Sequence, residues 1–246
     1  MIHTDLTTPS DEHYQLARAL LLYEQKRDYQ HAPAFVSVHD IQHHERGAAL
    51  APGRLLSERE LLELLTRLTG NGALRYLPPH VLAASSAGIA WFASAQQRPL
   101  FFNTSNFGAS RADPYLDETI SGHAYPVPAL LFIAGSAGLR LYALDRDERP
   151  TPDTRLYRAP FYNLFSDGRV CSGSMPRPTG VTPERTSDYE RAYFGSYFSH
   201  PNAAPLLNPS AWGGTYGEAW ARARELERFP SEWLVEQGMT LAQALP

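Results

Sequence analysis

Apolar and polar positions along the chain predict a mixture of strands and helices. The strongest helix signal runs from Ser57 to Leu68, where apolar residues repeat with helical spacing. Ser57 is the expected N-cap, and Glu60, three residues later, completes a capping box. Gly70 is expected to end the helix. The apolar stripe consists of Leu61, Leu64, Leu65 and Leu68.

Short segments rich in β-branched or aromatic residues predict strands on both sides of this helix. Residues 19–23 and 35–39 are expected to form a hairpin, because the second segment alternates between apolar and polar positions. Residues 89–93 and 100–102 are expected to pair around a turn at the polar residues 96–98. Aromatic residues in such strands are more often core than ligand platform.

The C-terminal half has three further strand signals, at residues 127–133, 139–144 and 156–165. Their short connections favour an antiparallel meander. The polar segment before them, rich in small residues, is the best candidate boundary in the chain. We therefore expect an N-terminal α+β region over residues 1–105, a linker over 106–125 and a second domain over 126–246.

Helices are expected after the meander. Thr182 and Pro183 are typical of the cap and the first position of a helix, which is predicted to reach residue 198. A second helix is predicted over residues 216–229. The last segment, 231–245, is expected to add one or two short helices. The overall class is therefore α+β.

Composition and charge exclude several functions. The net charge of −4 and the pI near 6.1 do not fit direct binding to nucleic acid or to an anionic membrane. No apolar run approaches the ~20 residues of a membrane span. The segment from Met1 to Asp5 lacks the basic and apolar parts of a secretory signal. We expect a cytoplasmic protein without a membrane partner.

Metal and cofactor sites are not expected. The chain has one cysteine, which rules out an intramolecular disulfide and a cysteine-cluster zinc site. His39, His43 and His44 form the densest histidine group, but structural zinc needs four ligands and no fourth is evident. We expect these histidines to be ordinary residues of a strand end and a polar loop.

The single cysteine, Cys171, stands in a segment that chemistry could use. The turn signal Ser166-Asp167-Gly168 precedes Arg169-Val170-Cys171, and the small residues 172–174 follow. Such a place favours a surface loop that another backbone can approach. The alternative is that Cys171 is a small buried hydrophobic residue, the commonest state of a free cysteine.

The spacing around Cys171 resembles that of ubiquitin-conjugating (E2) enzymes. Their active cysteine follows a motif of the form His-Pro-Asn, a few residues, Gly, one residue, Ile or Val, and Cys. Here Asn163 stands eight positions before Cys171, and the run from Gly168 to Cys171 supplies the rest. Segments 130–132, 139–144 and 154–161 resemble most closely the bacterial E2-like group called PRTRC system protein B.

The resemblance implies an E2/UBC-like antiparallel β-meander with flanking helices in the C-terminal half, preceded by the α+β N-terminal region. Phe161 and Tyr162 depart from the eukaryotic pattern, because they stand where His and Pro would be. The bacterial group is also described as lacking that histidine. The triplet His200-Pro201-Asn202 follows Cys171 instead, and proximity in the fold would let His200 serve the site.

The resemblance also implies the chemistry. Cys171 would accept a ubiquitin-like protein as a thioester and pass it to an amine, with Asn163 stabilising an oxyanion or holding the loop. Asp167 is a candidate base, and Arg169 or Arg177 could favour the thiolate. Two alternatives remain: a noncatalytic E2-like scaffold that binds a ubiquitin-like protein, and an unrelated cysteine hydrolase.

The partners implied are those of the bacterial gene cassettes. They comprise a ThiF-like activating enzyme, a small ubiquitin-like protein, a JAB-type metalloprotease and a ParB-related protein. No cofactor is implied for the chain itself. Neither the target of conjugation nor the role of the N-terminal half follows from the resemblance.

Overall fold

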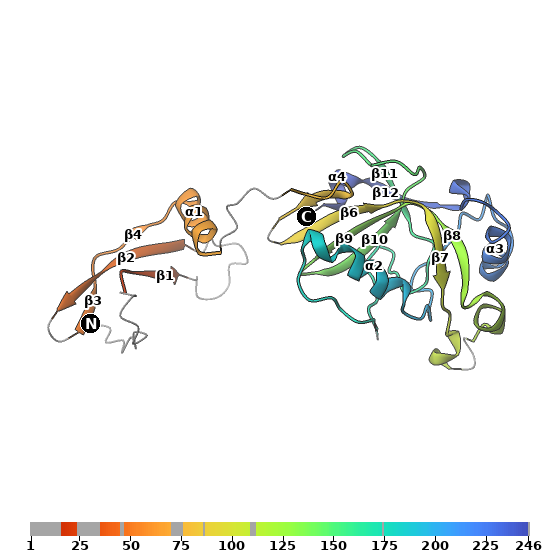
Figure 1. Ribbon diagram of the computed structural model, residues 1–246, viewed down its shortest axis with the longest axis horizontal. Coiled ribbons are helices and arrows are strands. Elements are labelled where there is room, and N and C mark those ends of the chain that lie inside the picture. The colour runs from red at the N-terminus through yellow and green to blue at the C-terminus, as the bar shows by residue number, and fades with distance from the viewer. Residues whose placement is uncertain are drawn as a thin grey trace. The chain divides into compact units, whose positions relative to one another are not determined.

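The computed structural model describes residues 16–23, 35–44, 47–69, 76–85, 87–108, 112–173 and 175–245. The chain divides into two compact units, residues 1–75 and 76–246 (Figure 1). The linker expected at 106–125 lies inside the second unit. Strand pairing joins the segments on both sides of it into one unit. Gly70, the expected helix stop, lies outside the described residues.

The first unit contains an antiparallel sheet and one helix. The expected hairpin is confirmed, since β1 (Arg18–Tyr23) pairs with β2 (Phe35–His44) along six residues. The expected helix is also confirmed: Ser57 N donates to the Glu60 carboxylate (3.0 Å), and Glu60 N donates to Ser57 Oγ (3.3 Å). The elements are β1 (Arg18–Tyr23), β2 (Phe35–His44), β3 (Gly47–Leu50), β4 (Arg54–Leu55) and α1 (Glu58–Thr69).

His39, His43 and His44 lie in β2, which continues to His44 because β3 pairs with its second half. The polar loop expected from Asp40 onward is therefore wrong. Among the described residues of this unit, Ser37 is the one buried side chain. Large apolar side chains remain exposed on both the strands and α1.

The second unit is built on a six-stranded antiparallel sheet with the strand order β12-β11-β10-β9-β6-β5. A separate pair, β7-β8, extends from it (Figure 1). The strands are β5 (Val81–Ala84), β6 (Gly88–Ala93), β7 (Gln96–Leu100), β8 (His123–Val127), β9 (Leu130–Gly135), β10 (Gly138–Ala143), β11 (Arg155–Arg158) and β12 (Val235–Thr240).

The helical segments of this unit are short. The 3₁₀ segments are η1 (Thr104–Phe107), η4 (Pro183–Arg185) and η5 (Ser231–Trp233), and η3 (Tyr115–Ile120) is a π-helix. The α-helices are α2 (Thr186–Phe194), α3 (Tyr216–Ala223) and α4 (Leu241–Ala244). The helix expected from Thr182 is confirmed in place, but it ends at Phe194, where Gly195 follows.

The expected meander is confirmed as β9-β10-β11, with antiparallel pairing throughout. One other expectation is wrong. Residues 96–98 belong to β7, which pairs with β8, whereas β6 pairs with β9. The short helices expected in the segment 231–245 are confirmed as η5 and α4, but the segment also contains β12, which pairs with β11 at the edge of the sheet. Its side chains are only half-buried or exposed, so its apolar pattern is weak.

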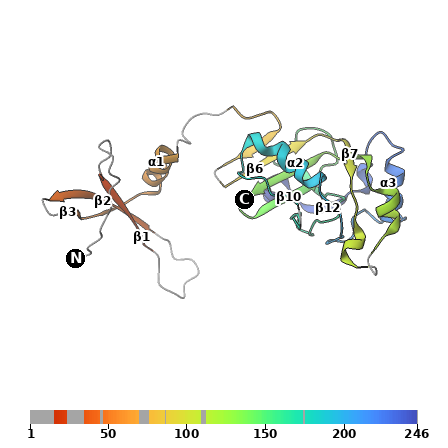
Figure 2. The same cartoon turned by 60° about the horizontal axis from the view of Figure 1, so that its bottom comes forward.

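Both faces of the central strands are covered, which explains their nearly continuous apolar sequences. In β9, Leu130 and Phe132 contribute to one core, and Leu131 and Ile133 contribute to the other. Helix α2 contributes to the first core, as does α3, which packs beside β8, and α4 contributes to the second. Figure 2 shows α2 lying over the strands. The fold is therefore a mixed α+β structure dominated by antiparallel sheet.

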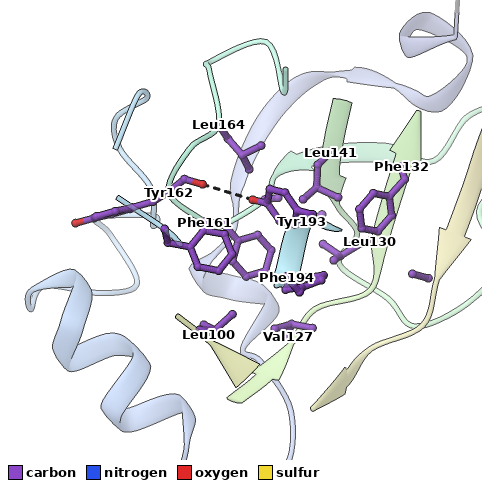
Figure 3. Packing of buried hydrophobic residues seen from close by; sticks show 14 of the residues in the cluster. Leu100, Val127, Leu130, Phe132, Leu141, Phe161, Tyr162, Leu164, Tyr193 and Phe194 are labelled. Atoms are coloured by element: carbon purple, nitrogen blue, oxygen red, sulfur yellow. Dashed lines mark hydrogen bonds between the residues drawn. The ribbon is translucent and has the colours of Figure 1, made fainter. Parts of the chain in front are cut away.

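Phe161, the residue before the candidate site, is anchored in a cluster of aromatic rings (Figure 3). It is 1% exposed and stacks between Phe198 and Trp220, each with its ring centroid 5.8 Å away. Phe194 meets its ring edge-on at 5.5 Å. Tyr193 OH donates to the main-chain carbonyl of Tyr162 (3.4 Å), which fixes the next residue as well.

This packing predicts a large effect of Phe161→Ala. Removing a buried phenylalanine leaves a cavity, and we expect a loss of about 3–5 kcal/mol in the free energy of unfolding, measured in urea. Phe165→Ala is the matched control, because Phe165 is 39% exposed; it should cost about 1 kcal/mol or less. Equal losses for the two variants would contradict the anchoring role of Phe161.

Candidate active site

Cys171 is an exposed free thiol. The interpretation of Cys171 as a buried hydrophobic residue is therefore wrong. The main-chain N of Cys171 donates to Asn163 O (2.8 Å), and Val170 N donates to Leu139 O of β10 (2.8 Å). These bonds hold the cysteine segment between β10 and the residues around Asn163. The thiol therefore stands on a fixed backbone at the protein surface.

The turn before Cys171 requires a glycine at position 168. Gly168 has φ +81°, and a Cβ atom there would lie 2.6 Å from the Tyr142 ring. Tyr142 OH donates to Asp167 O (2.8 Å), which holds the turn against β10. Gly168 thus shapes the turn and leaves no side chain for chemistry.

Asp167 and Arg169 form an ion pair with each other, with 2.6 Å between Asp167 Oδ2 and Arg169 Nε. Burial alone would raise the pKa of Asp167, but the hydrogen bonds and positive charge of Arg169 lower it below its usual value. The carboxylate is thus stabilised in its charged form, which makes Asp167 a weak base at neutral pH. Arg169 also lies over the Phe165 ring (5.4 Å), so its positive charge interacts with both this ring and the Asp167 carboxylate.

Asn163 joins two segments through its main chain. Its N donates to His200 O (2.8 Å), and its O accepts from Cys171 N (2.8 Å). Asn163 has φ +62°, the left-handed region, and it is the one described residue other than glycine with a positive φ. In an extended strand the main-chain N–H and C=O of one residue would point toward the same neighbouring strand. The left-handed conformation, which Asn tolerates better than most residues, lets them bond to different segments.

The Asn163 side chain is committed to the same second segment. Its Nδ2 donates to Tyr197 O (2.8 Å), while Oδ1 accepts from Ser199 N (3.1 Å), Ser199 Oγ (3.1 Å) and His200 N (3.2 Å). All of these partners lie between residues 197 and 200. The amide therefore acts in this structure as the clamp that holds this segment beside the cysteine.

The main chain of His200 is thus brought to Asn163, although His200 stands 29 positions after Cys171 in the sequence. Both residues bond to the main chain of Asn163. Tyr197 and Ser199 were not anticipated as site residues; the unusual triplet that begins at His200 was the one sequence signal near them. Arg177 was anticipated only through its charge, and it donates to Ser172 Oγ (2.7 Å), next to Cys171.

Tyr162, which stands where an E2 motif has proline, belongs to the core beneath the site. It stacks on Tyr216 with 4.7 Å between ring centroids and is 8% exposed. Burial, together with the charges of Asp113 and Asp117, raises the pKa of Tyr162 to about 12. Its phenol is therefore neutral at physiological pH and serves packing.

No group of three or more His, Cys, Asp or Glu side chains that could hold a metal ion occurs in the described part of the chain. None of the helices that the structure describes is long and apolar enough to span a bilayer.

The clamp predicts a difference between two substitutions of Asn163. Asn163→Gly removes the side-chain hydrogen bonds but tolerates the left-handed backbone, and it should cost about 2 kcal/mol of unfolding free energy. Asn163→Ala adds the strain of that backbone, about 1 kcal/mol more. Urea denaturation of both variants measures this. If alanine is tolerated as well as glycine, the left-handed junction is not what holds the segment.

Comparison with known proteins identifies a family. The model of prokaryotic E2 family D matches residues 58–237. The match covers most of the chain, including α1 and nearly all of the second unit. No significant match was found among curated proteins or solved structures. The chain therefore belongs to prokaryotic E2 family D, and its role is E2-like, in ubiquitin-like conjugation.

Proposed function

We propose that this protein carries a ubiquitin-like protein as a thioester on Cys171 and transfers it to an amine. The observation that supports this most directly is the exposed thiol on a loop tied to Asn163 at the E2 motif spacing. A noncatalytic scaffold would not need an accessible cysteine at this position. Membership of the E2 family favours acyl transfer over hydrolysis.

The reaction consists of two acyl exchanges. In the first, the Cys171 thiolate attacks the carbonyl carbon of the ubiquitin-like protein, which is held as a thioester on a ThiF-like activating enzyme. The activating enzyme's cysteine leaves as a thiolate. In the second, an amine attacks the Cys171 thioester, loses a proton to a base, and Cys171 leaves as a thiolate. Both exchanges pass through a tetrahedral oxyanion.

Asn163 is a positioning residue in this proposal. Its amide already donates to Tyr197 O, so stabilising an oxyanion would require it to release that bond. Asn163 instead holds the cysteine segment and the His200 segment together. His200 is the candidate to assist the incoming amine, since Asp167 is paired with Arg169 and its charged form is favoured.

The proposed partners are a ThiF-like activating enzyme and a small ubiquitin-like protein from the same gene cassette. A JAB-type metalloprotease would remove the conjugate or process the ubiquitin-like protein. A ParB-related protein is the fourth expected member of the cassette.

The carrier function predicts a specific adduct. The purified chain is mixed with the activating enzyme, the ubiquitin-like protein and ATP, and its intact mass is measured without reducing agent. Wild type should gain the mass of the ubiquitin-like protein less water, and a thiol should remove it. Cys171→Ser should form a thiol-resistant ester or no adduct, and Cys171→Ala should form none.

The activating enzyme provides the internal control, because its own charged form shows that the reaction mixture is competent. An uncharged wild-type chain beside a charged activating enzyme would contradict the carrier function. Equal binding of the ubiquitin-like protein to wild type and Cys171→Ala, without any adduct, would then support the scaffold.

A further inference from the structure

Strand β1 ends the sheet of the first unit with an open edge. It is the terminal strand in the order β1-β2-β3, and among the described residues no strand pairs with its outer side. Proteins commonly protect such edges with charges, proline or a bulge. Residues 19–23 contain none of these and read Ala-Leu-Leu-Leu-Tyr. The strands β1 to β4 also precede residue 58, where the family match begins.

The hydrogen bonds of β1 show which of its residues point outward. Ile41 N donates to Ala17 O (3.0 Å). These two residues lie opposite each other, because the next pair along the ladder joins Arg18 and Asp40. Hydrogen-bonded and non-hydrogen-bonded pairs alternate along an antiparallel ladder. The main-chain N–H and C=O groups of residues 18, 20 and 22 therefore point to the outer edge, where a further strand would bond to them.

The first unit also leaves much of its apolar surface uncovered. Ser37 is its one buried side chain among the described residues, whereas Leu20 is 43% exposed and Leu22 is 63% exposed. Small units that bury little surface commonly depend on association with another surface. A strand added to the edge of β1 would cover both leucines.

A cavity of about 400 Å³ lies on one face of this edge, between β1 and α1. Leu20 of β1 and Leu64 of α1 contribute to its apolar lining. Leu22 shares the face of Leu20, because alternate residues of a strand point to the same side. A strand added to β1 would thus bring every second side chain to the side of the cavity, where an apolar residue fits.

The charges near the edge permit the approach of an identical surface. Arg18 forms an ion pair with Asp40 (3.1 Å), and Arg54 forms one with Glu60 (2.9 Å). The cavity lining therefore carries both signs of charge, and two copies facing each other avoid the repulsion of a single-sign patch. A second copy of β1 also provides the free edge and the apolar side chains on both faces that the partner strand needs.

We propose that two copies of this chain associate edge to edge through β1, as an antiparallel pair around a two-fold axis. Such an axis stands perpendicular to the sheet, so paired residues share a face and their numbers differ by an even number. With the axis at Leu21, Leu20 pairs with Leu22 of the partner subunit, and Ala19 pairs with Tyr23 of the partner subunit. An axis at Leu20 would instead set Arg18 against a leucine.

Sedimentation equilibrium of the full chain tests the association. Wild type should have twice the mass of one chain. Leu22→Lys places a charge on the edge and should raise the dissociation constant at least about tenfold. Leu55→Lys is the matched control, because Leu55 is 64% exposed but lies on β4, on the other side of β2; it should stay dimeric. Leu20→Pro, which removes an outward N–H and keeps the bonds to β2, should dissociate the dimer as well.

Disulfide cross-linking tests the register, in chains that carry Cys171→Ser. Leu21→Cys should form a disulfide between two chains under mild oxidation. The two copies of residue 21 face each other across the axis, with about 4.5 Å between their Cα atoms. Tyr23→Cys is the control on the same face of β1; its two copies would lie roughly 14 Å apart and should not cross-link.

A single-chain mass for wild type at about 0.1 mM would overturn the proposal. A dimer that survives Leu22→Lys, or one that cross-links through Tyr23→Cys and not through Leu21→Cys, would overturn it as well. Another occupant of the edge has its own signature. If monomeric wild type forms a complex with the ubiquitin-like protein that Leu22→Lys abolishes and Leu55→Lys does not, the edge serves that partner and the self-association is wrong.

Discussion

The left-handed backbone of Asn163, closed by its side-chain hydrogen bonds, is the constraint on which the site depends. One residue bonds to the cysteine segment through its carbonyl and to the His200 segment through its N–H and its amide. Asparagine suits this place for two reasons: it tolerates a positive φ, and its side chain can both donate and accept. Few other residues would keep both segments in place.

The aromatic core explains why the site lacks the His-Pro pair of the eukaryotic motif. Phe161 and Tyr162 point into packed rings, so an imidazole at position 161 would be buried among apolar neighbours. A buried imidazole without a hydrogen-bond partner is costly. The nearest histidine in the hydrogen-bond network is His200, whose main-chain N donates to Asn163 Oδ1.

Local signals made some features predictable and left others hidden. The capping box at Ser57 and Glu60 and the apolar runs of β9 and β10 depend on near neighbours in sequence, and the expected elements are present. β12 and β7 were missed because their partners lie far away and their exposed faces are polar. The cysteine was found from motif spacing, whereas the approach of His200 depends on a hydrogen bond across 37 residues.

The group that Cys171 carries in the cell can be identified directly. The tagged chain is isolated from its host under acidic, nonreducing conditions, digested, and the peptide that contains Cys171 is sequenced by mass spectrometry. We expect the C-terminal residues of a ubiquitin-like protein on that cysteine, removed by hydroxylamine and absent from Cys171→Ala. A bare Cys171 in cells whose activating enzyme carries the ubiquitin-like protein would contradict it.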